Sequence, residues 1–398
     1  MSQSNVPATE NMQEAKLPRR DWIILPLLSL LTIAVLLLAA EGAARYFFVS
    51  VRDDSCEIDD STISFRFRPN CTSHSKSAEG PWMESQFNDC GYRTRESCGP
   101  KPPNTTRISL LGASSAEGYL VAYDETFAAR AAKQLTIELG RQVEIQNLGR
   151  EQCFPICIFH RVDEALALKS DLLLIAVAPL EFDRMDPSDV KDRYKPMLSG
   201  LDQAQLRKGI DPNKKALTPV EDFVRHSRAG LAALHFLFQN PATFERMYML
   251  SGEHANYLRT PFSPAWEKRM EAFDLLLGEM AQKARDANVP IVLVEDPSFA
   301  QVSLVSMSNV PPGLDPYAFN ERLREIAERH GIQFIDGLDA FRYGPAANQL
   351  FYVVDGHMNG KGCAMLGNAI AEQLMKEHRI ALLGQNEAQR RPAPERGR

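Results

Sequence analysis

The sequence predicts an α/β fold in which a parallel β-sheet is covered by helices on both faces. The first observation is that short apolar runs recur along the chain, each with the length and composition of a strand buried on both sides. The second is that helical patterns lie between these runs, and strands that alternate with helices are typical of parallel sheets. The predicted strands are residues 108–111, 143–148, 172–177, 291–294 and 332–335.

The helical patterns place apolar residues three and four positions apart. In residues 126–139, Phe127, Ala131, Leu135 and Leu139 follow this spacing and predict one buried face. Similar patterns precede the fourth and fifth strands and follow the fifth. These further predicted helices are residues 266–287, 317–330 and 364–374.

A third observation places a membrane helix before this fold. Residues 22–40 are almost wholly apolar and uncharged, and a helix needs about 20 such residues to cross a bilayer. Arg19 and Arg20 precede the run, which favours a cytoplasmic N-terminus and a periplasmic or extracellular main domain. We therefore predict a single-pass transmembrane anchor at residues 22–44. A cleaved signal peptide is the alternative, because small residues follow the run.

The composition of the chain indicates which partners it can bind and which cellular compartment its main domain occupies. The net charge is −6, and no basic patch with interleaved aromatic residues is present, so we expect no binding of nucleic acid. All cysteines follow the predicted anchor, as expected in an oxidising compartment. We expect disulfides between residues 56 and 98, and the pairing stays open. Because the number of cysteines is odd, at least one thiol is unpaired or used between chains. The seven cysteines are Cys56, Cys71, Cys90, Cys98, Cys153, Cys157 and Cys363.

The chain divides into segments of different character. A polar cytoplasmic tail, residues 1–21, comes before the anchor, and a cysteine-rich lead-in, residues 49–106, comes after it. The main domain is expected at residues 107–383, followed by a disordered tail at residues 384–398. A helical insertion at about residues 187–264 breaks the strand–helix alternation. It either forms a lid or one wall of the cleft, or it is a packing layer with no role in specificity.

The end of the first predicted strand presents a serine. Residues 107–111 are followed by Gly112, which allows a sharp turn, and Ser114 falls where the next helix would begin. Unpaired backbone N–H groups at a helix start can stabilise an anion that forms beside such a hydroxyl. An ordinary helix cap is the alternative role for Ser114.

An Asp-x-His pair near the end of the chain completes a possible triad. Asp355 and His357 lie in a glycine-rich loop before the last predicted helix. A carboxylate at this spacing can fix the imidazole tautomer and stabilise its protonated form. With Ser114, the chain holds a nucleophile, a base and an orienting acid. Cys153 and Cys157 have no second Cys or His pair beside them, so we expect no zinc site.

These blocks resemble those of the SGNH, or GDSL-like, hydrolases, specifically the membrane-anchored extracytoplasmic type. The likeness covers residues 88–374 apart from the insertion. It implies a three-layer, flavodoxin-like parallel sheet. The matching blocks are Asn88-Asp89-Cys90-Gly91-Tyr92-Arg93, Gly112-Ala113-Ser114-Ser115-Ala116-Glu117-Gly118, Asn147-Leu148-Gly149 and Asp355-Gly356-His357-Met358-Asn359-Gly360-Lys361-Gly362.

The resemblance implies a role for each matched residue. Ser114 would be the nucleophile, His357 the general base and Asp355 its orienting partner. The backbone N–H groups of Ser114 and Gly149 would form the oxyanion hole. The family's acyl transfer needs no metal or organic cofactor, so none is expected here.

Three positions depart from the family pattern. Ala113 stands at the usual aspartate of the first block, and Asp355 lies two residues before His357 where many members have three. Leu180 stands where the family often has an oxyanion-binding asparagine, and a leucine side chain cannot donate a hydrogen bond. Loss of one such donor costs about 10²–10³ in turnover. By position, the groups that could substitute are Arg150, Gln152 and Arg184.

The leading hypothesis is an anchored serine esterase or O-acyltransferase acting on acylated carbohydrate or a similar small ester. A second hypothesis is a catalytically silent domain that binds glycan or an envelope partner, as the change at Leu180 would allow. In a third, the anchor assembles a membrane complex, because Glu41 and Arg45 can pair at helical spacing.

Overall fold

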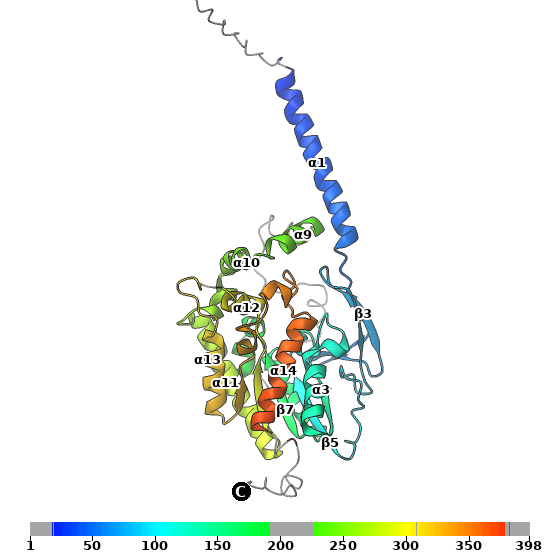
Figure 1. Ribbon diagram of the computed structural model, residues 1–398, viewed down its shortest axis with the longest axis vertical. Helices are drawn as coiled ribbons and strands as arrows, with labels where there is room; N and C mark the ends of the chain where they lie inside the picture. Colours follow the sequence, from blue (N-terminus) through cyan, green and yellow to red (C-terminus); the bar gives the residue numbers. More distant parts are fainter. Residues whose placement is uncertain are drawn as a thin grey trace, which may run out of the picture.

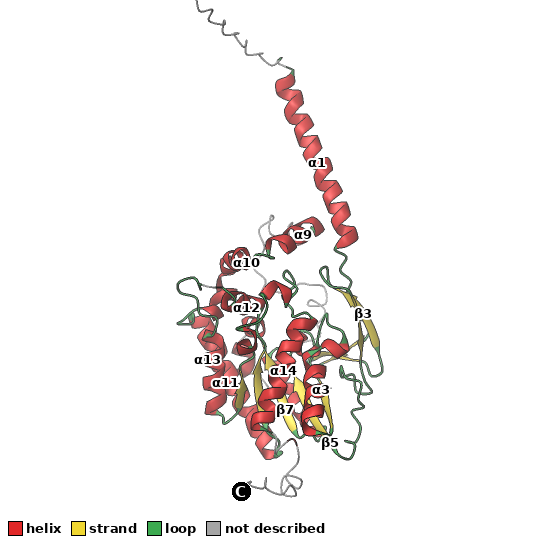
Figure 2. Cartoon of the chain, viewed as in Figure 1, coloured by secondary structure: helices red, strands yellow, loops and turns green. Residues whose placement is uncertain are grey.

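A central parallel sheet organises the molecule, as the computed structural model shows in Figures 1 and 2. The structure describes residues 18, 20–185, 187–191, 227–307, 309–378 and 382. Most of the predicted N-terminal tail, residues 192–226 of the predicted insertion and the C-terminal tail lie outside the described residues.

The sheet has the strand order β6-β5-β7-β8-β9, and every neighbouring pair is parallel. All residues of β5, β7 and β8 are buried, which explains the unbroken apolar runs of β7 and of residues 291–294 in β8. The predicted α/β fold and its flavodoxin-like strand order are confirmed. The strands are β5 (Thr105–Leu111), β6 (Gln142–Asn147), β7 (Leu172–Val177), β8 (Ile291–Glu295) and β9 (Gln333–Ile335).

Helices cover both faces of the sheet. The chain runs from β5 outward to β6, then returns past β5 to β7, β8 and β9. With right-handed crossovers, this path places α3 on one face and α4, α11 and α13 on the other. The last helix, α14, packs beside α3 (Figure 2). These helices are α3 (Phe127–Leu139), α4 (Pro155–Ala167), α11 (Pro264–Asp286), α13 (Ala318–Arg329) and α14 (Gly360–Glu377).

Local sequence signals fix where the long helices begin. Ser263 caps α11 by accepting the backbone N–H of Trp266, and Pro264 takes the first helical position. Asn359 caps α14 in the same way, with Lys361 and Gly362 as donors. The start of α14 is therefore fixed just after the Asp-x-His pair.

Short helices fill the connections between these elements. The α-helices among them are α2 (Ser114–Glu117), α5 (Pro179–Asp183), α6 (Pro187–Lys191), α9 (Arg228–Leu237), α10 (Pro241–Tyr248) and α12 (Phe299–Val305). The 3₁₀ helices are η1 (Tyr123–Glu125), η2 (Met249–Leu258), η3 (Leu338–Phe341) and η4 (Ala347–Gln349). Within the predicted insertion, the structure thus describes α6, α9, α10 and η2.

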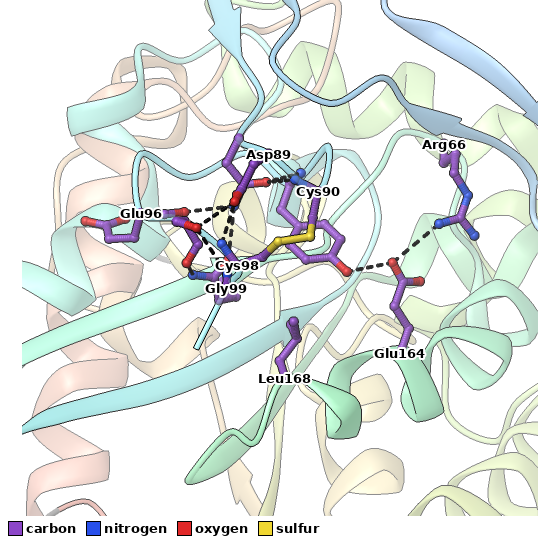
Figure 3. Close-up of a disulfide and its surroundings, with 12 residues drawn as sticks. Arg66, Asp89, Cys90, Glu96, Cys98, Gly99, Glu164 and Leu168 are labelled. Atoms are coloured by element: carbon purple, nitrogen blue, oxygen red, sulfur yellow. Dashed lines mark hydrogen bonds and ion pairs between the residues drawn. A yellow bond between two sulfur atoms is a disulfide. The ribbon is translucent and has the colours of Figure 1, made fainter. Parts of the chain in front are cut away.

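The lead-in contains two antiparallel hairpins. Two disulfides cross-link it, and disulfides were expected in this segment. Cys56 pairs with Cys71, and Cys90 pairs with Cys98 beside Asp89 (Figure 3). The hairpin strands are β1 (Glu57–Asp60), β2 (Ser64–Phe67), β3 (Thr72–Lys76) and β4 (Trp82–Gln86).

A third disulfide joins Cys153 to Cys157, a pair that the sequence did not single out for bonding. Cys153 lies before the start of α4, where the extended backbone of Phe154 lets the chain turn into the helix. The remaining cysteine, Cys363, is a buried free thiol.

The helix α1 (Asp21–Phe47) extends away from the domain (Figure 1). Its most apolar 18-residue window has a mean hydropathy of 2.8, and none of that window is buried in the protein. By length and composition, α1 can cross a membrane.

Candidate active site

The turn that carries Ser114, here called the nucleophile turn, directly follows β5. At this point the path of the chain through the sheet reverses direction. The chain leaves β5 for β6 on one side, and β7 lies on the other, so a crevice is expected beyond the carboxyl end of β5. A side chain on Gly112 would place its Cβ 2.5 Å from Ala116 Cβ and 2.8 Å from the Ala176 carbonyl oxygen. The turn therefore requires glycine, and it places Ser114 as the first residue of α2.

The structure brings the three predicted triad residues together. Ser114 Oγ lies 2.7 Å from His357 Nε2, although 243 positions separate them in the sequence. His357 Nδ1 lies 2.5 Å from Asp355 Oδ1. These distances are within hydrogen-bond reach, so the imidazole can take a proton from the Ser114 hydroxyl while the carboxylate orients the ring.

The turn at Gly356 makes the two-residue spacing workable. Gly356 has a φ of 89°, a left-handed conformation that glycine adopts without steric cost. Its N–H donates to the Tyr352 carbonyl at 2.7 Å, and the Tyr352 N–H donates to the His357 carbonyl at 2.9 Å. The loop closes on itself, and the Asp355 carboxylate folds back onto the imidazole of His357.

The surroundings of His357 raise its pKa above the ordinary value. Burial alone lowers the pKa, but the hydrogen bond and charge of Asp355 outweigh it, and the charges of Asp296 and Glu151 add to the rise. The Tyr119 ring packs edge-on against the imidazole, with 5.2 Å between ring centroids. The nearby carboxylates, Asp355 above all, thus favour the protonated form of the imidazole.

A second carboxylate, Asp296, lies directly after β8 and is buried. Burial raises its pKa to about 6, and a hydrogen bond to Ser115 opposes this rise. The two adjacent serines therefore have different partners: Ser114 faces His357, and Ser115 faces Asp296. Sequence reasoning missed Asp296, although an acid directly after a buried strand is a recognisable signal.

The two predicted oxyanion donors differ in whether their N–H groups already donate a hydrogen bond within the protein. Among the described residues, the Ser114 N–H has no acceptor. The Gly149 N–H donates to Asn147 Oδ1 at 2.9 Å, so a substrate oxygen would have to share or displace this bond. Leu180 is 52% exposed on α5, and its apolar side chain supplies no donor.

The groups predicted as substitutes for the missing donor make other contacts. Arg150 is buried, donates to the Ile63 carbonyl at 2.7 Å and lies 4.0 Å from the centre of the Phe65 ring. Arg184 lies 5.9 Å from the centre of the Phe154 ring. Gln152 has a positive φ of 60°, and its carbonyl accepts the Phe154 N–H at 3.1 Å.

Arg93 of the lead-in holds the far end of the nucleophile turn. This buried side chain donates to the carbonyls of Glu117, Gly118 and Val121. The first two carbonyls lie at the end of α2, where a helix offers them no N–H partner. Arg93 supplies the missing hydrogen bonds. The Gly-Tyr-Arg motif noted in the sequence thus supports the backbone that carries Ser114.

Glu79 of the lead-in holds the loop that carries Asp355 and His357, and no pattern in the sequence indicates this contact. Glu79 Oε2 accepts the backbone N–H groups of Val354 at 2.9 Å and Asp355 at 2.8 Å. Its other oxygen, Oε1, lies 2.7 Å from Nδ1 of His235 in α9. The Glu79 side chain is only 4% exposed, so it anchors the loop from the protein interior.

Among the described residues, the one cluster close enough to hold a metal ion is Asp89, Cys90 and Cys98. Its sulfur atoms are already joined in a disulfide, and thiolates are the metal-binding form of cysteine. Figure 3 shows this cluster in the lead-in beside the disulfide. The cluster therefore does not fit a metal site.

No protein-family model and no curated protein matches this chain. A search of solved structures finds ester hydrolases at low similarity. A protein described as lipolytic, of the G-D-S-L family from Desulfitobacterium hafniense, is 13% identical with a TM-score of 0.35, covering 67% of this chain and 98% of its own.

Two acetyl-ester hydrolases match at a similar level. A variant of an acetyl-xylooligosaccharide esterase from Geobacillus stearmophilus is 13% identical with a TM-score of 0.36, covering 67% of this chain and 93% of its own. An acetyl xylan esterase is 12% identical with a TM-score of 0.37, covering 67% and 99%. Because these TM-scores lie below 0.5, they decide nothing about the activity of this chain.

We predict that the reactivity of Ser114 rises with pH through the raised pKa of His357, because only the neutral imidazole accepts the serine proton. The rate of Ser114 labelling by a fluorophosphonate, measured between about pH 5 and 9, should therefore have a midpoint above about 6.5. Asp355→Asn removes the main cause of the rise, so the midpoint should move down and the plateau rate should fall by up to about 10⁴-fold. An unchanged midpoint in Asp355→Asn would contradict the assignment.

We predict that Glu79 positions the loop that carries Asp355 and His357. Glu79→Ala removes two backbone hydrogen bonds to a charged acceptor, each worth about 1.5–3 kcal/mol. The Ser114 labelling rate should fall by at least about tenfold, since 1.4 kcal/mol corresponds to tenfold in rate. Glu79→Gln keeps an acceptor oxygen and should recover part of the loss. The matched control is Glu84→Ala in β4, an exposed site that should label at the parent rate.

Proposed function

We propose that this chain is a membrane-anchored serine esterase or O-acyltransferase that acts through Ser114, His357 and Asp355. The observation that carries the proposal is the continuous contact from Ser114 Oγ to His357 and on to Asp355. The order and content of the sequence blocks support the same chemistry. The substrate class is an acylated carbohydrate or a similar small ester.

The mechanism follows from these contacts. Ser114 Oγ attacks the ester carbonyl carbon while its proton passes to His357 Nε2, and Asp355 stabilises the resulting imidazolium. The tetrahedral intermediate then collapses, and His357 returns the proton to the departing alkoxide oxygen. Water or a sugar hydroxyl next attacks the acyl group on Ser114, giving its proton to His357. The acid or the new ester is released, and Ser114 regains its proton.

The proposed topology has the N-terminus in the cytoplasm, α1 across the membrane and the catalytic domain in the periplasm or outside the cell. The apolar length of α1 supports the crossing. The disulfides of the lead-in and of residues 153–157 support an oxidising compartment for the domain. Arg19 and Arg20 before the helix support the orientation.

The oxyanion side of the site favours a second candidate function. Leu180 supplies no donor, and the Gly149 N–H is already bonded to Asn147. A catalytically silent domain that binds glycan or an envelope partner would fit a site with this deficit. In that case Ser114→Ala would leave the cellular role intact.

We predict that Ser114→Ala abolishes fluorophosphonate labelling and reduces aryl acetate hydrolysis to background. Loss of the triad nucleophile typically lowers turnover by about 10⁶-fold. Ser115→Ala is the adjacent control and should keep labelling, because Ser115 does not contact His357. The readout is gel fluorescence of the full chain in detergent, together with release of the aryl alcohol. Labelling that persists in Ser114→Ala would contradict the proposal.

A further inference from the structure

Helix α9 is mostly apolar, yet none of its residues is fully buried in the protein. Residues 228–237 read Arg-Ala-Gly-Leu-Ala-Ala-Leu-His-Phe-Leu, with Arg228 and His235 as the titratable groups. No residue of α9 is buried, and Phe236 and Leu237 are 71% and 49% exposed. An exposed apolar face of this kind marks a site of contact with another protein or with a membrane.

The exposed residues of α9 share one face. Ala233, Phe236 and Leu237 are the exposed positions along the helix, and their spacing of three and four places them side by side. His235 lies on a different face, where it contacts Glu79 at 2.7 Å and the Phe48 ring at a centroid distance of 5.7 Å. One side of α9 is therefore held by the domain, and the apolar stripe points away from that contact.

Helix α9 begins at the end of the anchor. Glu41 of α1 accepts the Ser227 hydroxyl at 2.7 Å and the backbone N–H groups of Arg228 at 3.2 Å and Ala229 at 3.0 Å. Glu41 directly follows the uncharged apolar run at residues 22–40, whose length matches the hydrocarbon core of about 30 Å. The start of α9 is thus fixed at the level where α1 would leave the membrane.

The neighbourhood has the composition of a membrane interface. Tyr46 and Phe47, in the last turn of α1, are 78% and 71% exposed. Tyrosine is enriched at the headgroup level of bilayers, where its ring is apolar and its hydroxyl reaches water. In Figure 1, α9 lies beside the end of α1, between the anchor and the body of the domain.

We propose that the Ala233–Phe236–Leu237 face of α9 rests in the outer leaflet of the membrane that α1 crosses. This inference depends on the proposed single-pass topology. The docked helix would hold the domain against the bilayer, and His235 would connect it through Glu79 to the backbone of Asp355. The catalytic loop would then lie close to the membrane surface, where an ester carried by the bilayer could reach it.

The test measures the depth of α9 in a bilayer. The full chain is reconstituted in phosphatidylethanolamine–phosphatidylglycerol vesicles with a nitroxide attached at Phe236→Cys. Power saturation compares collisions with oxygen, which partitions into lipid, and with a water-soluble nickel chelate. Leu31→Cys reports whether α1 is inserted. Leu275→Cys, at a position of α11 that is 62% exposed, is the solvent control, and the parent chain gives the background of buried Cys363.

We expect the oxygen-to-nickel collision ratio at residue 236 to exceed that at residue 275 several-fold and to approach the ratio at residue 31. Leu237→Cys should behave similarly, which guards against a local effect of one label. A ratio at residue 236 equal to that at residue 275 would overturn the inference. So would shielding from both probes, because it would mean that protein covers this face, either a second copy or residues 192–226.

A failure of the topology is distinguishable from a failure of the docking. If residue 31 is accessible to the nickel chelate, α1 does not cross the membrane, and the inference falls with it. If residue 31 is inserted while residue 236 is accessible, the anchor is retained and only the docking is wrong. Neither outcome depends on the enzyme being active.

Discussion

The site depends on a constraint of parallel sheets, which is that all strands deliver their carboxyl ends to one edge. Ser114 follows β5 and His357 precedes α14, yet their side chains meet at 2.7 Å. The close backbone approach at Gly112 fixes one partner, and the Gly356 turn with the Asn359 cap fixes the other. Each half is a local segment, but the fold of the whole sheet is needed to bring the two halves together.

The lead-in is part of this assembly. Arg93 binds the carbonyls at the end of α2, and Glu79 binds the backbone of the Asp355 loop. Both side chains are almost completely buried, so their charges are used on backbone groups within the protein. The lead-in between α1 and the sheet domain therefore holds the backbone beside both parts of the candidate triad.

Much of the fold could be predicted from the sequence because its signals are local. Strand β7 is buried on both faces, so its residues form an unbroken apolar run. The triad could be predicted because each member lies in a compact glycine-containing block. Glu79 could not, because its partners are backbone groups 275 and 276 positions away. The hydrogen bond from the Gly149 N–H to Asn147 Oδ1 likewise depends on side-chain orientation, which a motif does not fix.

The third disulfide and α9 show a different limit. Cys153 and Cys157 are spaced like neighbours on one helix, but Cys153 lies outside α4, and that placement is what allows the bond. Leu231 and Leu234 have the helical spacing that is typical of a buried face, yet both are only half-buried. Periodicity indicates that a face is apolar, but it does not say whether protein or lipid covers it.

The most direct test of the account is to trap the acyl-enzyme. The full chain in detergent is mixed with an aryl acetate and quenched with acid within the first turnover, and its peptides are analysed by mass spectrometry. The account predicts an acetyl group on Ser114 that accumulates before steady state and is absent from His357→Ala. Turnover without acetylation of Ser114, or acetylation confined to Ser115, would contradict it.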